Sequence, residues 1–113
     1  MDNTFDVQTK YCTYTNCNFY TSTYDANGEL YIGVVADLGD GLEPVMDITV
    51  NLGARTPKDC IAVKNHSENN GVLAEMQRIG LVTEVVEWVQ SGFVKIPICR
   101  YDPDVLERYR YSG

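Results

Sequence analysis

An Asn-Gly pair at positions 27 and 28 lies between two segments rich in aromatic and β-branched residues. This pair is a strong short-range hairpin signal, because both central positions of a type I′ turn require a positive φ angle. The preceding segment is YCTYTNCNFYTSTY and the following one is ELYIGVVAD. Such side chains favour a pleated surface. The sequence therefore predicts a hairpin with strands at 18–26 and 29–37.

Two more strands are predicted after the glycine- and proline-containing segment LGDGLEP. In PVMDITVNL polar and apolar residues alternate, which indicates a half-buried strand. After the turn segment GARTPKD, the run CIAVKN is typical of a short strand that is apolar on both sides. We expect these two strands and the hairpin to form a four-stranded meander.

The periodicity changes after Asn69, where apolar residues recur at helical spacing. The recurring residues are Val72, Leu73, Met76 and Ile79. Asn69 or Asn70 can cap the first N–H groups, and Gly80 supplies the left-handed residue that commonly ends a helix. The pattern predicts one amphipathic helix of three turns.

The segment from Leu81 to Tyr101 returns to β-branched and aromatic residues, broken once at Ser91-Gly92. It predicts a second hairpin, at about 82–90 and 93–100. A helix over VTEVVEWVQ is the alternative. Pro103 in the tail indicates a short helical turn that starts after Asp102.

The only tryptophan lies in the first strand of this second hairpin. Val86, Trp88 and Gln90 share one strand face. We therefore expect Trp88 to anchor the core together with Val86 and the helix residues Leu73 and Met76.

The chain has 113 residues, 44% of them hydrophobic, which suits one domain with one core. We expect a single α+β domain over 1–113. Its core, at 18–110, would be a small, mostly antiparallel sheet of about five to six strands, with one amphipathic helix packed on it and a short C-terminal helical turn. Residues 1–10 are polar and are expected to be loose.

The formal net charge of −7 disfavours direct binding of nucleic acid, which requires a clustered cationic surface. No apolar run approaches the roughly 18 residues of a membrane span, and the first residues lack the pattern of a signal peptide. We therefore expect a cytoplasmic protein without membrane contact.

Four cysteines and the single histidine raise the question of a metal site. These residues are Cys12, Cys17, Cys60, Cys99 and His66. They supply only one closely spaced pair, whereas structural zinc sites use two. The sequence therefore predicts reduced thiols, with no metal and no cofactor.

Catalytic residues are not predicted. Cys60 and His66 could nominally form a nucleophile and a base, but Cys60 begins an apolar strand, where a thiolate is disfavoured. Glu84 and Glu87 would lie on opposite faces of a strand. Because glycine-rich phosphate loops, serine elbows and metal motifs are absent as well, we expect that the protein is not an enzyme.

The segments ITVNL, CIAVKN, the helix ending in IGLV, and SGFVKIPICRYD occur in this order. In order and spacing they resemble an uncharacterised bacterial family, a domain of unknown function whose members occur on plasmids, conjugative elements and phages. The resemblance covers roughly residues 19–109. It implies a small accessory protein of a mobile element, with no established activity, cofactor or catalytic residue to carry over.

Arginines and tyrosines alternate near the C-terminus, a mixture enriched at interface hot spots. The candidate partner-binding residues here are Arg100, Tyr101, Arg108 and Tyr109. Alternatively, these rings close the edges of a small sheet. A second aromatic group lies near the N-terminus and comprises Tyr11, Tyr14, Phe19, Tyr20 and Tyr24.

Acidic residues cluster around the first long loop at Asp37, Asp40 and Glu43, with Asp47 following them. They form a second candidate partner-binding site, and could imitate nucleic-acid phosphates toward a basic groove. The leading hypothesis is a non-enzymatic protein that binds a host or element-encoded protein, for example as an inhibitor of a host defence system. The alternatives are an acidic nucleic-acid mimic and a structural homodimer built from an exposed sheet edge.

Overall fold

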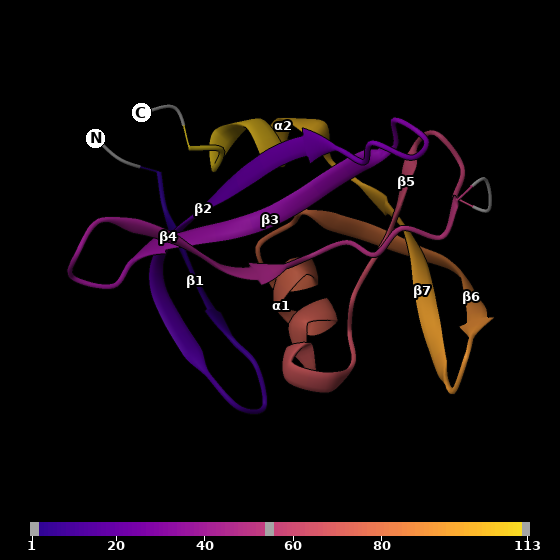
Figure 1. Ribbon diagram of the computed structural model, residues 1–113, viewed down its shortest axis with the longest axis horizontal. Coiled ribbons are helices and arrows are strands. Elements are labelled where there is room, and N and C mark those ends of the chain that lie inside the picture. The colour runs from indigo at the N-terminus through magenta and orange to yellow at the C-terminus, as the bar shows by residue number, and fades with distance from the viewer. Residues whose placement is uncertain (1–2, 54–55, 112–113) are drawn as a thin grey trace.

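The structure, a computed structural model, describes residues 3–53 and 56–111 (Figure 1). In chain order the elements are β1 (Phe5–Gln8), β2 (Thr13–Thr23), β3 (Leu30–Asp37), β4 (Leu42–Asp47), β5 (Cys60–Ala62), the 3₁₀ turn η2 (Ser67–Asn69), α1 (Val72–Arg78), β6 (Val82–Ser91), β7 (Val94–Tyr101) and α2 (Pro103–Arg108). The strands form two antiparallel sheets, of order β1-β2-β3-β4 and β5-β7-β6. The predicted sheet-rich α+β class is confirmed, but the described residues form two sheets with seven strands in all, instead of one sheet of five or six.

The first predicted hairpin is confirmed as β2 and β3, which pair from Asn18 with Val35 to Thr23 with Leu30. Its turn differs from the prediction. Residues 24–29 form a wider turn in which only Gly28 takes a positive φ angle, 71°. The side chain of Asn27 instead accepts a hydrogen bond from the Glu29 N–H.

The predicted half-buried strand at PVMDITVNL divides into two parts. Residues up to Asp47 pair with β3 as β4. Ile48 donates its N–H to the Ile32 carbonyl at 2.8 Å, whereas the Val50 N–H donates to the Ala62 carbonyl at 2.9 Å. This segment therefore joins the two sheets. Consequently β5 belongs to the second sheet, and the predicted meander is wrong at its last strand.

Part of the segment expected to be loose, residues 1–10, forms a strand. β1 pairs with β2, and Phe5 and Val7 are 5% and 0% exposed. The alternation of two apolar and two polar residues over only four positions is too short a signal to identify a strand. β1 is also attached to α1, because the Gln8 N–H donates to Glu75 Oε1 at 2.9 Å.

A helix is confirmed at the predicted position as α1, but its seven residues make about two turns instead of three, and its cap is different. Asn65 Oδ1 accepts the Leu73 N–H at 2.9 Å, and Asn69 instead donates its side-chain amide to the Asp47 carbonyl. Gly80 follows the helix with a positive φ angle of 89°. α2 begins at Pro103, as predicted, and neither described helix has the length and apolar character needed to cross a membrane.

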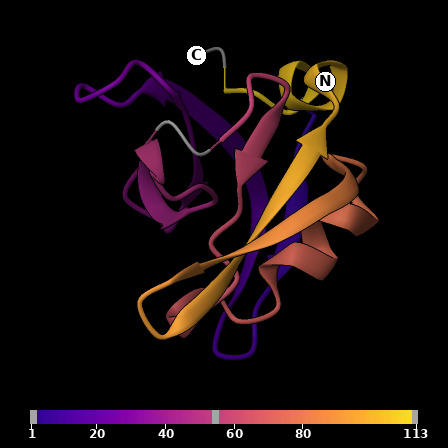
Figure 2. The ribbon, with the colours of Figure 1, turned by 90° about the vertical axis from the view of Figure 1, so that its right-hand side faces the viewer.

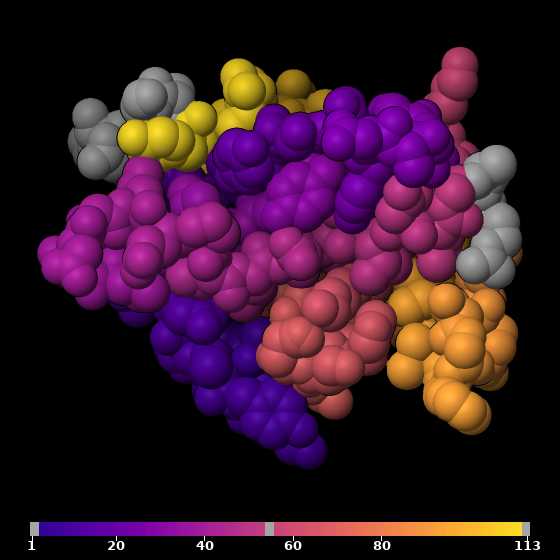
Figure 3. All heavy atoms as spheres, in the orientation of Figure 1, coloured from indigo at the N-terminus to yellow at the C-terminus, as the bar shows by residue number. Residues whose placement is uncertain are grey.

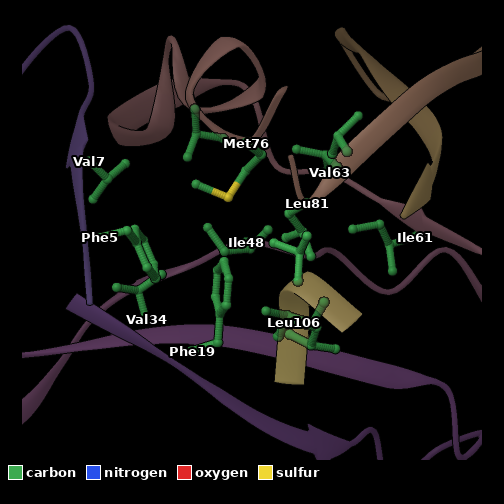
Figure 4. Close-up of a cluster of buried hydrophobic side chains, with 14 of the residues drawn as sticks. Phe5, Val7, Phe19, Val34, Ile48, Ile61, Val63, Met76, Leu81 and Leu106 are labelled. Carbon is green, nitrogen blue, oxygen red and sulfur yellow. The ribbon is translucent and has the colours of Figure 1, made fainter. Parts of the chain in front are cut away.

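One large apolar cluster lies between the two sheets and the helices (Figure 4). It includes Phe5, Val7, Phe19, Val34, Ile48, Ile61, Val63, Met76, Leu81 and Leu106. A smaller cluster covers the other face of the second sheet and comprises Cys60, Ala62, Ile96 and Ile98, with Val50, Leu52, Val89 and Val94 packed against it. The two faces of this sheet are therefore both partly covered.

The second predicted hairpin is confirmed as β6 and β7, so the helical alternative for VTEVVEWVQ is wrong. The expected burial of Trp88 is also wrong, because its residue is 51% exposed and Val86 is 43% exposed. The register of β6 shifts between Val82 and Glu84 and again between Val85 and Glu87. These irregularities break the simple alternation of faces, and Val82 and Val85 pack on the main cluster instead.

Candidate protein-binding surface

Three exposed apolar side chains lie on the β6–β7 hairpin. Val86 and Trp88 are on β6, and Phe93 lies in the turn, fully exposed at 105%. The turn is held by Gly92, whose φ angle is 60°, and by a 2.9 Å hydrogen bond from Gln90 Nε2 to the Gly92 carbonyl. Because residue 93 lies beyond the last residue of β6, its ring has no sheet face against which to pack. We call Val86, Trp88 and Phe93 the hairpin surface.

The hairpin surface adjoins an open sheet edge. In the second sheet β7 is central and β6 is lateral, as Figure 2 shows. Within the described parts of the chain, β6 forms strand pairs with β7 alone. From Glu87 to Ser91 the pairing is regular, ending with Ser91 opposite Val94. Residues 87–91 therefore present an outer row of backbone groups next to Trp88.

The charges of this edge are unequal in their pairing. Glu84 Oε1 forms an ion pair with Arg100 Nε at 3.2 Å, and Arg100 Nη1 also donates to Asp59 Oδ2 at 2.7 Å. Glu87 has no ion pair within residues 3–53 and 56–111. The regular half of the edge therefore carries a carboxylate that is not neutralised by a neighbouring cation.

The predicted arginine–tyrosine residues occupy different environments. Arg100 is engaged with the two carboxylates described above, and Tyr101 is half-buried against the main cluster. Arg108 is exposed at the end of α2.

Tyr109 packs its ring on two core rings, with centroid distances of 5.5 Å to Phe5 and 6.4 Å to Phe19. Its carbonyl accepts the Phe19 N–H at 2.8 Å. Tyr109 therefore closes the margin of the core, which is the alternative role considered for these tyrosines.

The structure brings the predicted acidic residues together at one hairpin tip. Asp37 ends β3, Asp40 lies in the turn and Glu43 is near the start of β4, and all three are exposed. Asp37 Oδ1 accepts the Gly39 N–H at 2.8 Å, which stabilises the turn. In Figure 1 this tip and the β6–β7 turn lie at opposite ends of the long axis. We call these three residues the acidic tip.

Asp47 is separate from the acidic tip and belongs to a tyrosine group on the first sheet. Tyr31 donates its hydroxyl to Asp47 Oδ1 at 2.6 Å, and its ring lies edge-on to Tyr20 and Tyr24 at centroid distances of 6.1 and 5.7 Å. Burial and the nearby Asp47 carboxylate raise the pKa of Tyr31. Gly33 leaves room for the Tyr31 ring, since a Cβ atom at residue 33 would collide with it. We call Tyr20, Tyr24 and Tyr31 the tyrosine group.

The thiols are poorly suited to nucleophilic chemistry. Burial raises the pKa of Cys17 to about 11 and that of Cys99 to about 12, and it also raises the pKa of Cys60. Cys12 is the exposed cysteine. The described residues contain no cluster of three or more His, Cys, Asp or Glu side chains that could hold a metal ion.

A hollow of about 330 Å³ lies between the β2–β3 turn and the segment that leads into β5. Its walls include Asn27, Glu29, Thr56 and Lys58. Thr56 Oγ1 is buried there without a hydrogen-bond partner. The titratable residues of the lining are Glu29, Lys58 and Cys60, and burial raises the pKa of the Cys60 thiol, which favours its neutral form. The lining contains no histidine or second carboxylate to act as a base beside that thiol, so this hollow lacks the arrangement expected of an active site.

The hairpin surface was missed because Trp88 and Val86 were assigned to the core. Two signals in the sequence indicate it. The acid Glu87 sits between the two apolar side chains, and Phe93 directly follows the turn residue Gly92, where a ring cannot reach the core. Neither signal reveals that β6 is a lateral strand, which depends on the order of strands.

In comparisons with known proteins, no curated protein and no solved structure matches the chain. A protein-family model does match, over residues 21–113, which include β3 to α2 and the last part of β2. The prediction of an uncharacterised domain family is thus confirmed, and the chain belongs to the family described as domain of unknown function DUF4313.

Proposed function

We propose that this protein is not an enzyme and acts by binding another protein through the hairpin surface and the adjoining edge of β6. The observation that carries the proposal is the exposure of Val86, Trp88 and Phe93 on one hairpin, next to an edge strand with a regular outer row of backbone groups. Aromatic side chains that protrude without intramolecular partners are typical anchors of protein interfaces.

The energetics support this use of the hairpin. Burying a large apolar side chain such as phenylalanine contributes about 1.5–3 kcal/mol, and tryptophan is among the most frequent hot-spot residues. Figure 3 shows the hairpin atoms, in orange, as a lobe at the lower right, beside α1. The hairpin therefore stands at the surface of the molecule, where a partner can reach it.

A catalytic role is disfavoured by the chemistry of the candidate nucleophiles. A cysteine nucleophile acts as the thiolate, and burial shifts Cys17, Cys60 and Cys99 toward the neutral thiol. The hollow beside the β2–β3 turn offers Lys58 and Glu29 but no histidine or paired carboxylates. Binding without chemistry is the simpler use of this molecule.

The resemblance to proteins of plasmids, conjugative elements and phages supports a role in a mobile genetic element. In that setting the protein is a small cytoplasmic accessory factor of a mobile element, and its partner is encoded by the host or by the element. We propose inhibition of a host defence system as the outcome of binding. Occupying an interface requires no catalytic group, which agrees with the properties of the hairpin surface.

The test is affinity capture from the native host with tagged protein, followed by mass spectrometry. We expect a reproducible protein partner for the wild type, and loss of that partner for the double variant Trp88→Ala, Phe93→Ala. The control is Tyr11→Ala, which removes another exposed ring, 63% exposed, from a different part of the surface. Equal capture by all three proteins would exclude the hairpin surface as the binding site.

A further inference from the structure

We infer that the partner contributes an extended basic segment, which adds to the second sheet as a fourth strand alongside residues 87–91. This inference rests on the proposed function, because it names the chemistry of the partner at the same surface. Its first support is the open outer edge of β6, and its second is the charge of that edge.

The regular half of β6 can accept a strand. Residues 87–91 pair with residues 94–98 of β7 without a register shift, whereas both irregularities of β6 lie before residue 88. In a regular antiparallel strand, alternate backbone N–H and C=O groups point away from the neighbour already present. An extended peptide satisfies these groups with its own backbone, as in other cases of strand addition.

Charge complementarity indicates that the added segment is basic. β6 contains the acids Glu84 and Glu87 and no lysine or arginine. Arg100 offsets Glu84, so Glu87 remains to face a side chain of the added strand. Opposite charges on neighbouring strands are stabilising, and a lysine or arginine can also lie over the Trp88 ring.

The rest of the protein favours the same kind of partner. The net charge is −7, and the acidic tip adds three exposed carboxylates at the far end of the molecule. This field attracts a cationic partner and increases its rate of association at low salt. Lys95 lies opposite Gln90 on the central strand β7 and not on the edge itself.

The same charges disfavour a second copy of the chain as the occupant. Pairing of β6 with its own copy would place two acids from each chain in one strand pair, between two molecules that each carry −7. Like charges at close range on adjacent strands are destabilising. The irregular first half of β6 also prevents a long pairing between copies.

The experiment uses three synthetic ten-residue peptides with the full-length protein. One alternates lysine with valine, and the second has glutamate in place of every lysine. The third keeps the lysines and has proline in place of every valine, which removes the backbone N–H donors at those positions. Trp88 is the only tryptophan, so its fluorescence reports binding at this edge directly. Amide hydrogen exchange locates the contact.

We expect the lysine peptide to shift the Trp88 emission and to slow exchange at residues 87–91, with at least about tenfold tighter binding than the glutamate peptide. The proline peptide should bind about tenfold more weakly than its parent. Glu87→Lys should weaken binding of the lysine peptide by about tenfold. Glu43→Lys makes the same change of net charge at the acidic tip and should alter affinity by less than about threefold at 0.15 M salt.

Three results would overturn the inference: no peptide changes the Trp88 emission, the lysine and glutamate peptides bind equally well, or the protein alone forms a dimer that protects residues 87–91 from exchange. Each of these is distinguishable from failure of the proposed function. Capture of a partner that depends on Trp88 and Phe93 would still support binding through the hairpin surface, with a partner that does not add a basic strand.

Discussion

The tyrosine group and the hairpin surface both contain aromatic rings at least partly open to solvent, but they differ in what holds the rings. Tyr31 has a 2.6 Å hydrogen bond to Asp47 and two ring neighbours, and Tyr24 shares a 3.0 Å hydrogen bond with Thr49. Trp88 and Phe93 have no ring neighbour or side-chain hydrogen bond within the described residues. Aromatic content alone therefore does not locate a binding surface; the absence of internal partners is more informative.

The largest expected effect on stability is at Phe19, a core ring that shows how much a fully held aromatic side chain contributes. Phe19 is fully buried and contacts Phe5 at a ring-centroid distance of 4.5 Å. Phe19→Ala should lower the free energy of unfolding by about 3–5 kcal/mol, because it removes a large core side chain and leaves a cavity. Urea unfolding followed by circular dichroism measures the change. A loss below about 1 kcal/mol would show that this ring is not part of a tightly packed core.

Tyr109 tests a ring that lies between the buried and exposed extremes. It is half-buried and packs on Phe5 and Phe19, so Tyr109→Ala should cost about 2 kcal/mol. Its neighbour Arg108 is exposed, and Arg108→Ala should change stability by less than about 0.5 kcal/mol. Chemical denaturation of both variants provides the comparison. If both variants lose a negligible amount of unfolding free energy, Tyr109 is a free surface residue and not part of the core margin.

The buried thiols predict a loss of stability at alkaline pH. Burial raises the pKa of Cys17 to about 11 and that of Cys99 to about 12, whereas thiols of an unfolded chain ionise near about 8.5. Their contribution is fully present below about pH 8.5 and is lost as the pH rises toward the folded values, because the unfolded chain then releases protons that the folded chain retains.

Unfolding experiments between pH 8 and pH 10 should show a fall of about 2 kcal/mol for each of these thiols. Cys99→Ala should make the fall shallower, and Cys12→Ala, at the exposed cysteine, should leave its slope unchanged. A slope that does not depend on Cys99 would mean that this thiol ionises freely in the folded protein.

The smallest expected effect among these aromatic rings is at Trp88. Because half of this residue is exposed, Trp88→Ala should lower the free energy of unfolding by only about 1 kcal/mol. Circular dichroism is the suitable probe, since the variant has no tryptophan to follow by fluorescence. A loss of 3–5 kcal/mol, typical of a buried tryptophan, would mean that Trp88 belongs to the core and would remove the contrast with the tyrosine group.

Local patterns were sufficient to predict both hairpins, α1 and the start of α2. Asn27-Gly28, the helical spacing from Val72 to Ile79, and Pro103 each act within a few residues of the element they specify. The order of strands was not predictable, because it depends on where the chain crosses from one sheet to the other at Ile48 and Val50. The prediction that Trp88 is buried failed for a related reason, since the register shifts of β6 depend on its pairing with β7.

For the candidate sites too, contacts between near neighbours in sequence were predictable and contacts between distant residues were not. The acidic residues meet at one tip because they are near neighbours in the chain, whereas Arg100 and Tyr109 were expected at a surface and have partners far away in sequence. Asp59 lies 41 residues before Arg100, and no local pattern connects the two.

The position of β1 has a consequence for how the molecule is divided. The family match begins at residue 21, yet Phe5, Val7 and Phe19 supply side chains to the main cluster and β1 is bonded to α1 through Gln8 and Glu75. A fragment trimmed to residues 21–113 would lose these three side chains and most of β2, the strand that pairs with β3. The segment that defines membership of the family is therefore smaller than the segment that folds, and genetic truncation at the family boundary should give an aggregating product instead of a minimal domain.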